Sequence, residues 1–192
     1  HSLIIIVALG ESIVAIGVGI AALPISWPPV AGALLGLSVS VSLWWIYFDV
    51  TATMAERALA DAPEDERPRL ARDAFSYLHL PLIAGIVLLA LGLKKVLEYV
   101  GDTEQHELTD PLTGVGLFAL IGGVVIYLVG HVAFKLRTQQ VFYWPRLVAA
   151  GALVAVLPLG AMVPALVLLA VVAAVLGLLV GYETHHHAEL RD

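Results

Sequence analysis

The sequence predicts an all-α integral membrane protein with about six transmembrane helices packed in a bundle. Hydrophobic residues make up 60% of the chain, charged residues 14%, and the mean hydropathy is +0.93. Soluble domains are about 45–50% apolar and about 25% charged. The apolar residues form blocks of roughly 20, which is the length an α-helix needs to cross a hydrocarbon core about 30 Å thick. We therefore expect residues 1–192 to form a single transmembrane domain.

The first predicted span covers residues 3–23, a continuous apolar run that stops before Pro24. The second, residues 29–50, begins at a proline, which the first turn of a helix tolerates because the missing N–H would have no partner there. Its far end carries aromatic residues typical of a membrane interface. Residues 51–73 form a polar connection, in which we expect a short helix, a proline break and the entry to the next span.

The third predicted span, residues 74–100, contains Pro81 near its beginning. This proline either bends the helix and frees a carbonyl, or simply belongs to the first turn. The fourth span, residues 112–135, is rich in glycine along one side. Both spans carry a histidine close to the same predicted side of the membrane, His79 in the third and His131 in the fourth.

The fifth predicted span, residues 142–158, begins beside an aromatic pair and a proline. The sixth, residues 164–182, also begins at a proline. Residues 183–192 are predicted to be a polar cytoplasmic tail.

Basic residues gather on one side of this topology. Three segments on that side hold eight of the ten Lys and Arg residues: the 51–73 connection, the 135–146 connection with Lys135, Arg137 and Arg146, and the tail. The positive-inside rule therefore predicts that both ends of the chain and residues 51–73 are cytoplasmic. The net charge of −6 argues against nucleic-acid binding. The chain has no cysteine, so thiolate chemistry and disulfides are excluded.

Glu11 is a carboxylate inside the first apolar span. A charged group at mid-helix costs about 2.5–3.5 kcal/mol on insertion scales, and such residues usually face protein or a wet cavity. Glu11 lies beside a stripe of small residues that includes Ala8, Ala15 and Gly19. We therefore expect Glu11 to face neighbouring helices. It is either a structural glutamate that fastens two helices or an ion or proton site.

Four ionisable side chains are predicted at similar depth in the cytoplasmic half: Glu11, Asp49, His79 and His131. Carboxylates and imidazoles relay protons or bind divalent cations. The sequence fixes their depth and leaves their direction around each helix open. Asp49 has a simpler interpretation as an interfacial residue, and His131 as a hydrogen-bonded interior histidine.

Small residues recur at helical spacing in several spans and predict close helix packing. Beside the three in the first span, these are Gly32, Gly36, Gly123 and Gly130. Gly17, Gly19 and Ala22 match a dinucleotide-binding pattern, but a membrane helix lacks the strand and the acidic residue that such a site needs. The sequence indicates no cofactor and assigns no metal.

Three stretches together resemble the bacterial low temperature requirement A family: SLIIIVALGESIVAIG, FSYLHLPLIAGIVLLALGLKK and GGVVIYLVGHVAFKLR. The resemblance implies a polytopic protein of the bacterial cytoplasmic membrane, linked by its family name to growth in the cold. It also implies that this chain is the C-terminal part of a longer protein, with a missing N-terminal transmembrane half as partner. The positions matching family motifs are Gly10, Glu11, Ser12, Tyr77, His79, Pro81 and His131.

Three functions remain open from the sequence. The first is an ion- or proton-coupled transporter that uses a buried Glu11, assisted by His79 and His131. The second is a membrane scaffold or cold-adaptation factor that carries nothing. The third, ranked last, is an intramembrane metal enzyme. The expected partners are the lipid bilayer and the missing half, with a homo-oligomer as a further candidate.

Overall fold

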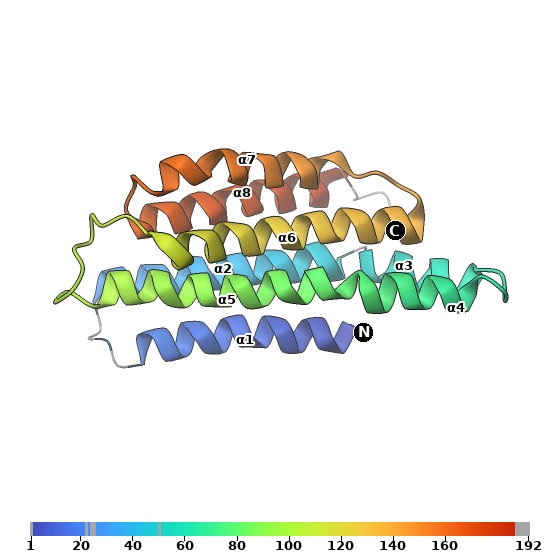
Figure 1. The fold of residues 1–192 in the computed structure, drawn as a ribbon, viewed down its shortest axis with the longest axis horizontal. Coiled ribbons are helices and arrows are strands. Elements are labelled where there is room, and N and C mark those ends of the chain that lie inside the picture. Colours follow the sequence, from blue (N-terminus) through green and yellow to red (C-terminus); the bar gives the residue numbers. More distant parts are fainter. Residues whose placement is uncertain (1, 22, 24–25, 50, 187–192) are drawn as a thin grey trace.

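The computed structural model describes residues 2–21, 23, 26–49 and 51–186, and every element named within these ranges is helical. Figure 1 shows the long helices lying side by side along one axis, with α3 and α4 extending from one end. The helices are α1 (Ser2–Ile20), α2 (Trp27–Phe48), α3 (Thr51–Asp61), α4 (Arg67–Leu70), the π-helix η1 (Ala71–Tyr77), α5 (His79–Gly101), α6 (Gly114–Gln139), α7 (Trp144–Gly160) and α8 (Ala165–His186).

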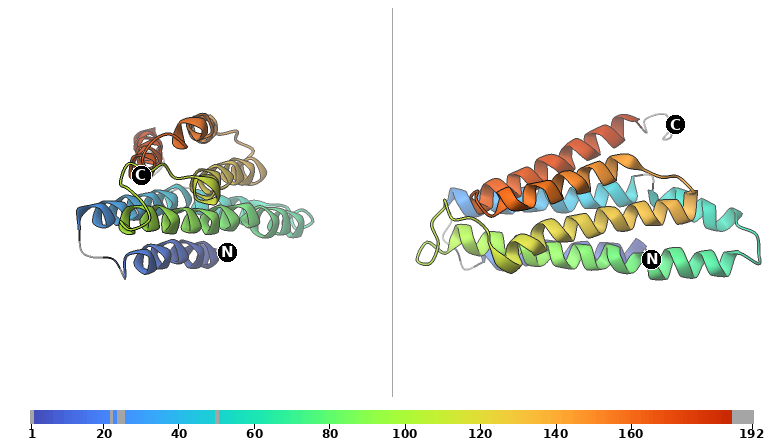
Figure 2. Two further views of the ribbon diagram at one scale, coloured as in Figure 1. Left: turned by 60° about the vertical axis from the view of Figure 1, so that its left-hand side comes forward. Right: turned by 45° about the horizontal axis from the view of Figure 1, so that its top comes forward.

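Five of the helical segments are long and apolar enough to cross a membrane, which confirms the predicted fold class. The sixth apolar helix, α7, is shorter, with 17 residues. An α-helix rises about 1.5 Å per residue, so α7 reaches about 25 Å. Two views in Figure 2 show α7 and α8 stacked on the opposite side of the bundle from α1.

The centre of the bundle is the α5–α6 pair, where two backbones approach closely. A Cβ added at Gly123 would lie 2.5 Å from the backbone nitrogen of Leu89, and one added at Gly85 would lie 2.7 Å from the carbonyl oxygen of Gly123. Small residues permit this approach in a membrane, where packing replaces the hydrophobic effect as the force that holds helices together. The other helices pack around this pair, with α1 at one edge against α5 and α2.

The connection between α2 and α5 has the predicted order of a short helix, a proline break and a helix entry. After α3, the chain turns at Pro63 and enters α4 and then the π-helix η1. The amide of Leu78 donates to the carbonyl of Asp73, five residues back, which is the wide turn of a π-helix. Pro81 falls in the first turn of α5, directly after the π-helix, within a helical segment that runs from Arg67 to Gly101.

The last helix also differs from its predicted limits. Prediction ended the sixth span at residue 182 and assigned residues 183–192 to a tail. In the structure, α8 continues to His186 and Glu183 is buried. The helix extends because Glu183 has a buried cationic partner, described below. Residues 187–192 of the predicted tail lie outside the described residues.

Candidate functional site

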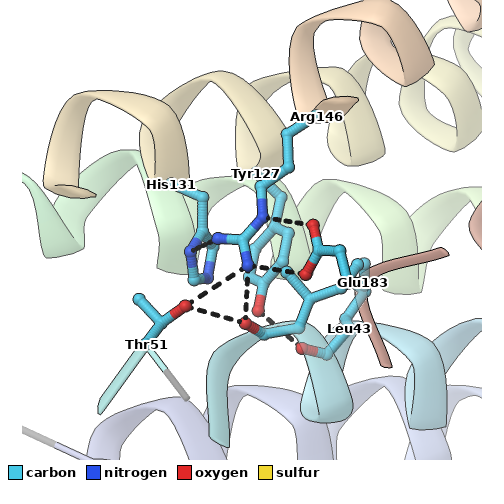
Figure 3. A network of polar contacts seen from close by, with 7 residues as sticks. Leu43, Thr51, Tyr127, His131, Arg146 and Glu183 are labelled. Carbon is cyan, nitrogen blue, oxygen red and sulfur yellow. Dashed lines mark hydrogen bonds and ion pairs between the residues drawn. The ribbon is translucent and has the colours of Figure 1, made fainter. Parts of the chain in front are cut away.

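Arg146 lies at the centre of a polar network inside the bundle, at the end where α1 begins and α8 ends (Figure 3). Its residue is 2% exposed, although it sits in the first turn of α7. Nε and Nη2 donate to the two carboxylate oxygens of Glu183, at 2.8 and 2.9 Å. This bidentate geometry matches the fork of a guanidinium to a carboxylate and gives both charges a partner.

The same guanidinium reaches two further helices. Nη1 donates to His131 Nδ1 on α6 at 2.7 Å. Nη2 also donates to the carbonyl of Ile46 near the end of α2, at 3.2 Å, and to Thr51 Oγ1 at the start of α3, at 3.3 Å. One side chain of α7 therefore joins α2, α3, α6 and α8.

The contact with Arg146 sets the tautomer of His131. Arg is a donor only, so Nδ1 of this imidazole must present its lone pair, and its proton resides on Nε2. His131 is completely buried, and Nε2 has no hydrogen-bond partner among the described residues. Most buried polar groups are paired, so an orphaned imidazole nitrogen marks a strained or functional position.

A second histidine, His79 on α5, lies against the same aromatic residues. Its Nδ1 is 3.0 Å from the carbonyl of Ala74, in the π-helix, and its Nε2 is 2.9 Å from the hydroxyl of Tyr47. The carbonyl can only accept, so His79 carries its proton on Nδ1 and Tyr47 donates to Nε2. His79 and His131 are therefore opposite tautomers, each edge-on to the ring of Tyr47, with centroids 5.9 and 5.7 Å away.

Two backbone carbonyls in the C-terminal part of α2 accept hydrogen bonds from side chains of this network. Tyr127 on α6 donates its hydroxyl to the carbonyl of Leu43 at 2.7 Å, while Arg146 binds the carbonyl of Ile46 (Figure 3). Side-chain donors here supplement the helical hydrogen bonds close to the point where α2 ends. Movement of α2 at this end would break these contacts.

A second buried cation adjoins the ion pair. Lys135 is 4% exposed, and its Nζ lies 4.1 Å from the centroid of the Tyr143 ring. The guanidinium of Arg146 lies 5.4 Å from the same ring. A ring face attracts cations, which compensates part of the cost of burying two positive charges beside one carboxylate.

Glu11 does not face the interior of this bundle, which corrects our expectation for its side chain. The buried face of α1 consists of Ile5, Ala8, Leu9, Ser12 and Ile16. Glu11 lies one residue, or about 100° of helical rotation, from the centrally placed Ser12, and it is exposed. The small residues beside it, Ala8, Ala15 and Gly19, are buried or half-buried, whereas the side chain of Glu11 points away from the bundle.

Ser12 is the polar residue of this motif that does lie inside. Its hydroxyl donates to the carbonyl of Leu9 at 2.7 Å and lies 2.9 Å from Ser40 Oγ on α2. Both serines are buried, so the pair joins α1 to α2.

The other candidate residues lie apart from the histidines or at the surface. Asp49 follows α2 and is half-buried, and its amide donates to the carbonyl of Trp45. Tyr77 is 60% exposed, beneath the guanidinium of Arg72. Of the four ionisable residues predicted to share a depth, the structure brings together His79 and His131. No group of three or more His, Cys, Asp or Glu side chains within the described ranges could hold a metal ion.

The glycines predicted to pack helices meet neighbouring side chains or backbone. A Cβ added at Gly19 would lie 2.9 Å from Leu97, and one added at Gly36 would lie 3.1 Å from Ile16. The equivalent distances are 3.0 Å at Gly32, 2.5 Å at Gly123 and 3.1 Å at Gly130. Ala8 is buried and Ala15 is half-buried.

Comparison with known proteins places these features in a family. The family described as bacterial low temperature requirement A protein (LtrA) matches residues 1–181. The chain belongs to the LtrA family. A curated relative, "Uncharacterized protein RA0937" of Rhizobium meliloti (strain 1021), is 31% identical over 145 residues, a match that covers 73% of this chain and 32% of the relative. The chain thus spans about a third of that relative's length, and no solved structure matches it.

Sequence reasoning missed the central pair of this LtrA domain. Arg146 was counted among cytoplasmic positive charges, and Glu183 was assigned to the tail. The position of the two residues in the sequence was the available signal. Arg146 follows Trp144 and Pro145 directly, and Glu183 follows a long apolar run. Antiparallel neighbours bring such residues to the same depth, which would have suggested a pair. Tyr47, Tyr127 and Thr51 carried no comparable signal.

Proposed function

We propose that this integral membrane protein of the LtrA family moves protons across the membrane, with His131 as the group that binds and releases them. The observation that supports the proposal is the contact between His131 Nδ1 and Arg146 Nη1, at 2.7 Å. Ionisable residues inside membrane proteins are usually functional, and chains of them serve as proton relays in transporters.

The geometry makes a proton and Arg146 competitors for one lone pair. His131 can accept a second proton only at Nδ1, because Nε2 already carries one. An arginine stays protonated, so it must leave Nδ1 when that nitrogen is protonated. The charged groups around this exchange are Glu183, Lys135 and Arg146, and the neutral imidazole of His79 lies across the Tyr47 ring.

Displacement of Arg146 would couple proton binding to helix movement. The guanidinium also binds the end of α2, the start of α3 and Glu183 of α8. A shift that releases His131 therefore strains four helices at one end of the bundle. Such a change in packing at one end is the kind of rearrangement that alternating access requires.

The test is proton flux into liposomes that contain the reconstituted protein and a trapped pH-sensitive dye. Glutamine can accept a hydrogen bond from Arg146 and cannot carry the proton, so His131→Gln is expected to lower the flux at least tenfold. The matched control is His106→Gln, which changes a histidine in the α5–α6 connection. Equal flux for His131→Gln and wild type would contradict the assignment. Glu11→Gln in the same assay tests whether the exposed carboxylate takes part.

A second candidate is a membrane scaffold that carries nothing, in which the network only fixes the helices. The observation that favours it is the closed packing of the network. A cavity of about 810 Å³ lies at the opposite end of the bundle, and no member of the network lines it. The scaffold predicts that His131→Gln retains growth in the cold, whereas disruption of α5–α6 packing abolishes it.

A further inference from the structure

The exposed face of α1 carries a carboxylate at the middle of this apolar helix. Glu11 is the tenth of the 19 residues of this helix and is exposed. Within the described part of the chain, it has neither an ion pair nor a side-chain hydrogen bond. Its exposed helical neighbours include Val7, Val14 and Val18. Valine side chains are compatible with either lipid or protein as a neighbour. The carboxylate of Glu11 is therefore the group that indicates which of the two lies against this face.

Lipid is an unfavourable neighbour for Glu11. A charged residue at the centre of a transmembrane helix costs about 2.5–3.5 kcal/mol on insertion scales, and Glu11 is too far from either end to reach the interface easily. Residues of this kind face a bundle interior or a wet cavity. A protein surface that offers a hydrogen-bond donor would remove most of the cost.

Two glycines provide a second, independent observation on the same helix. A Cβ added at Gly10 or at Gly17 would meet nothing within 4 Å, whereas one added at Gly19 would meet Leu97 at 2.9 Å. The two open glycines are seven residues apart and therefore lie on one side of the helix, two turns from each other. Glycines at such spacing permit close approach of another helix, and no helix of this bundle uses them.

A symmetric second copy fits this face poorly. Two-fold symmetry would place the same patch on both partners, so a contact centred on this face would bring two Glu11 carboxylates together. Like charges in a site of low dielectric constant oppose each other unless one is protonated. A helix from another part of a longer polypeptide is the alternative to a second copy of this chain. The match to the curated relative covers only 32% of that relative, so that protein has additional sequence beyond the matched part.

We propose that the face of α1 formed by Gly10, Glu11, Val14 and Gly17 packs against a transmembrane helix from a part of a longer polypeptide outside these 192 residues. That helix presents small residues to the two glycines and a hydrogen-bond donor to Glu11. The proposal is independent of proton transport, since it concerns assembly alone. Figure 1 shows α1 at the edge of the bundle, where such a helix has access.

The test is photo-crosslinking in the native polypeptide that carries this segment, in its own membrane. Val14→benzoylphenylalanine places the probe on the face, and Phe118→benzoylphenylalanine, at an exposed position of α6, is the control. We expect the Val14 probe to give a crosslink to a peptide outside residues 1–192 at the mass of one chain. A covalent dimer, lipid adducts alone, or a native polypeptide with no further transmembrane helix would overturn the proposal.

A glycine series tests the mode of packing. The double variant Gly10→Leu with Gly17→Leu is expected to lower the crosslink yield at least fivefold, and at both positions an added Cβ meets nothing of this bundle within 4 Å. The matched control is Gly177→Leu on α8, where an added Cβ also meets nothing within 4 Å and the yield should not change. A yield unaffected by the double variant would show that α1 does not approach another helix through its glycines.

Discussion

At the scale of single residues, the Arg146–Glu183 pair is the feature on which the polar network depends. Both residues are almost fully buried, at 2% and 4% exposure. Burying two charges is costly, and the pair is stable only because each charge meets the other with good geometry. Removing one partner leaves an uncompensated charge, whereas removing both removes the two charges together and leaves only the neutral acceptors of Arg146 without their donor.

We therefore expect Arg146→Met to lower the free energy of unfolding by about 3–5 kcal/mol. The double variant Arg146→Met with Glu183→Met should recover part of that loss, because it removes the uncompensated charge although His131 Nδ1 still loses its donor. Denaturant titration in detergent, followed by tryptophan fluorescence, measures both. Lys94→Met is the control, because Lys94 and Glu98 form an exposed pair at 3.9 Å that contributes about 0–1 kcal/mol. A double variant less stable than the single variant would refute this account of the pair.

The hydroxyl of Tyr47 is the partner of His79 Nε2. Tyr47→Phe removes this buried hydrogen bond, so we expect it to destabilise the protein by about 0.5–1.5 kcal/mol. Tyr99→Phe is the matched control, because that hydroxyl meets Thr113 Oγ1 at 3.3 Å at the surface. Thermal unfolding of the two variants in the same detergent compares them, and equal midpoints would contradict the buried bond.

At the scale of elements, the contact between α5 and α6 determines how closely the bundle can pack. Gly85, Gly92 and Gly123 each lie against backbone of the facing helix. Backbone cannot move aside as a flexible side chain can, so even one methyl group forces the helices apart. The neighbouring Gly122 has nothing within 4 Å and provides an internal comparison.

Gly123→Ala should therefore destabilise the protein by about 1–3 kcal/mol, as overpacking does. Gly122→Ala should be neutral or stabilising by up to about 1 kcal/mol, because alanine is the better helix former. The same denaturant titration measures the two adjacent changes. A Gly123→Ala variant as stable as Gly122→Ala would show that the helices do not touch here.

At the scale of the whole molecule, the helices form a bundle whose polar connection α3–α4 extends from the end where α1 begins (Figure 1). The positive-inside rule predicts that this end is cytoplasmic. The absence of native cysteine allows direct labelling. We expect Asp65→Cys to react with an impermeant maleimide only from the cytoplasmic side, and Glu104→Cys only from the other. Reaction of both from the same side would refute the topology.

The sequence was sufficient for the fold because apolar run length and proline positions are local properties. Helix limits were less predictable where tertiary contacts extend a helix, as Glu183 does in α8. Depth followed from counting residues, which correctly placed His79 and His131 at the same end. Direction around a helix depends on how helices pack, and this is why Glu11 was expected inside while Ser12, its neighbour, is the buried residue.

The state of the His131 imidazole is the most direct test of the proposed proton site. Solid-state nitrogen NMR of histidine-labelled protein in bilayers, assigned with His131→Gln, reports which ring nitrogen carries a proton. We predict an unprotonated Nδ1 in contact with Arg146 Nη1 at neutral pH, and on acidification a protonated Nδ1 with loss of that contact. A protonated Nδ1 that keeps the contact, or an imidazole that gains no proton before the bundle unfolds, would contradict the account.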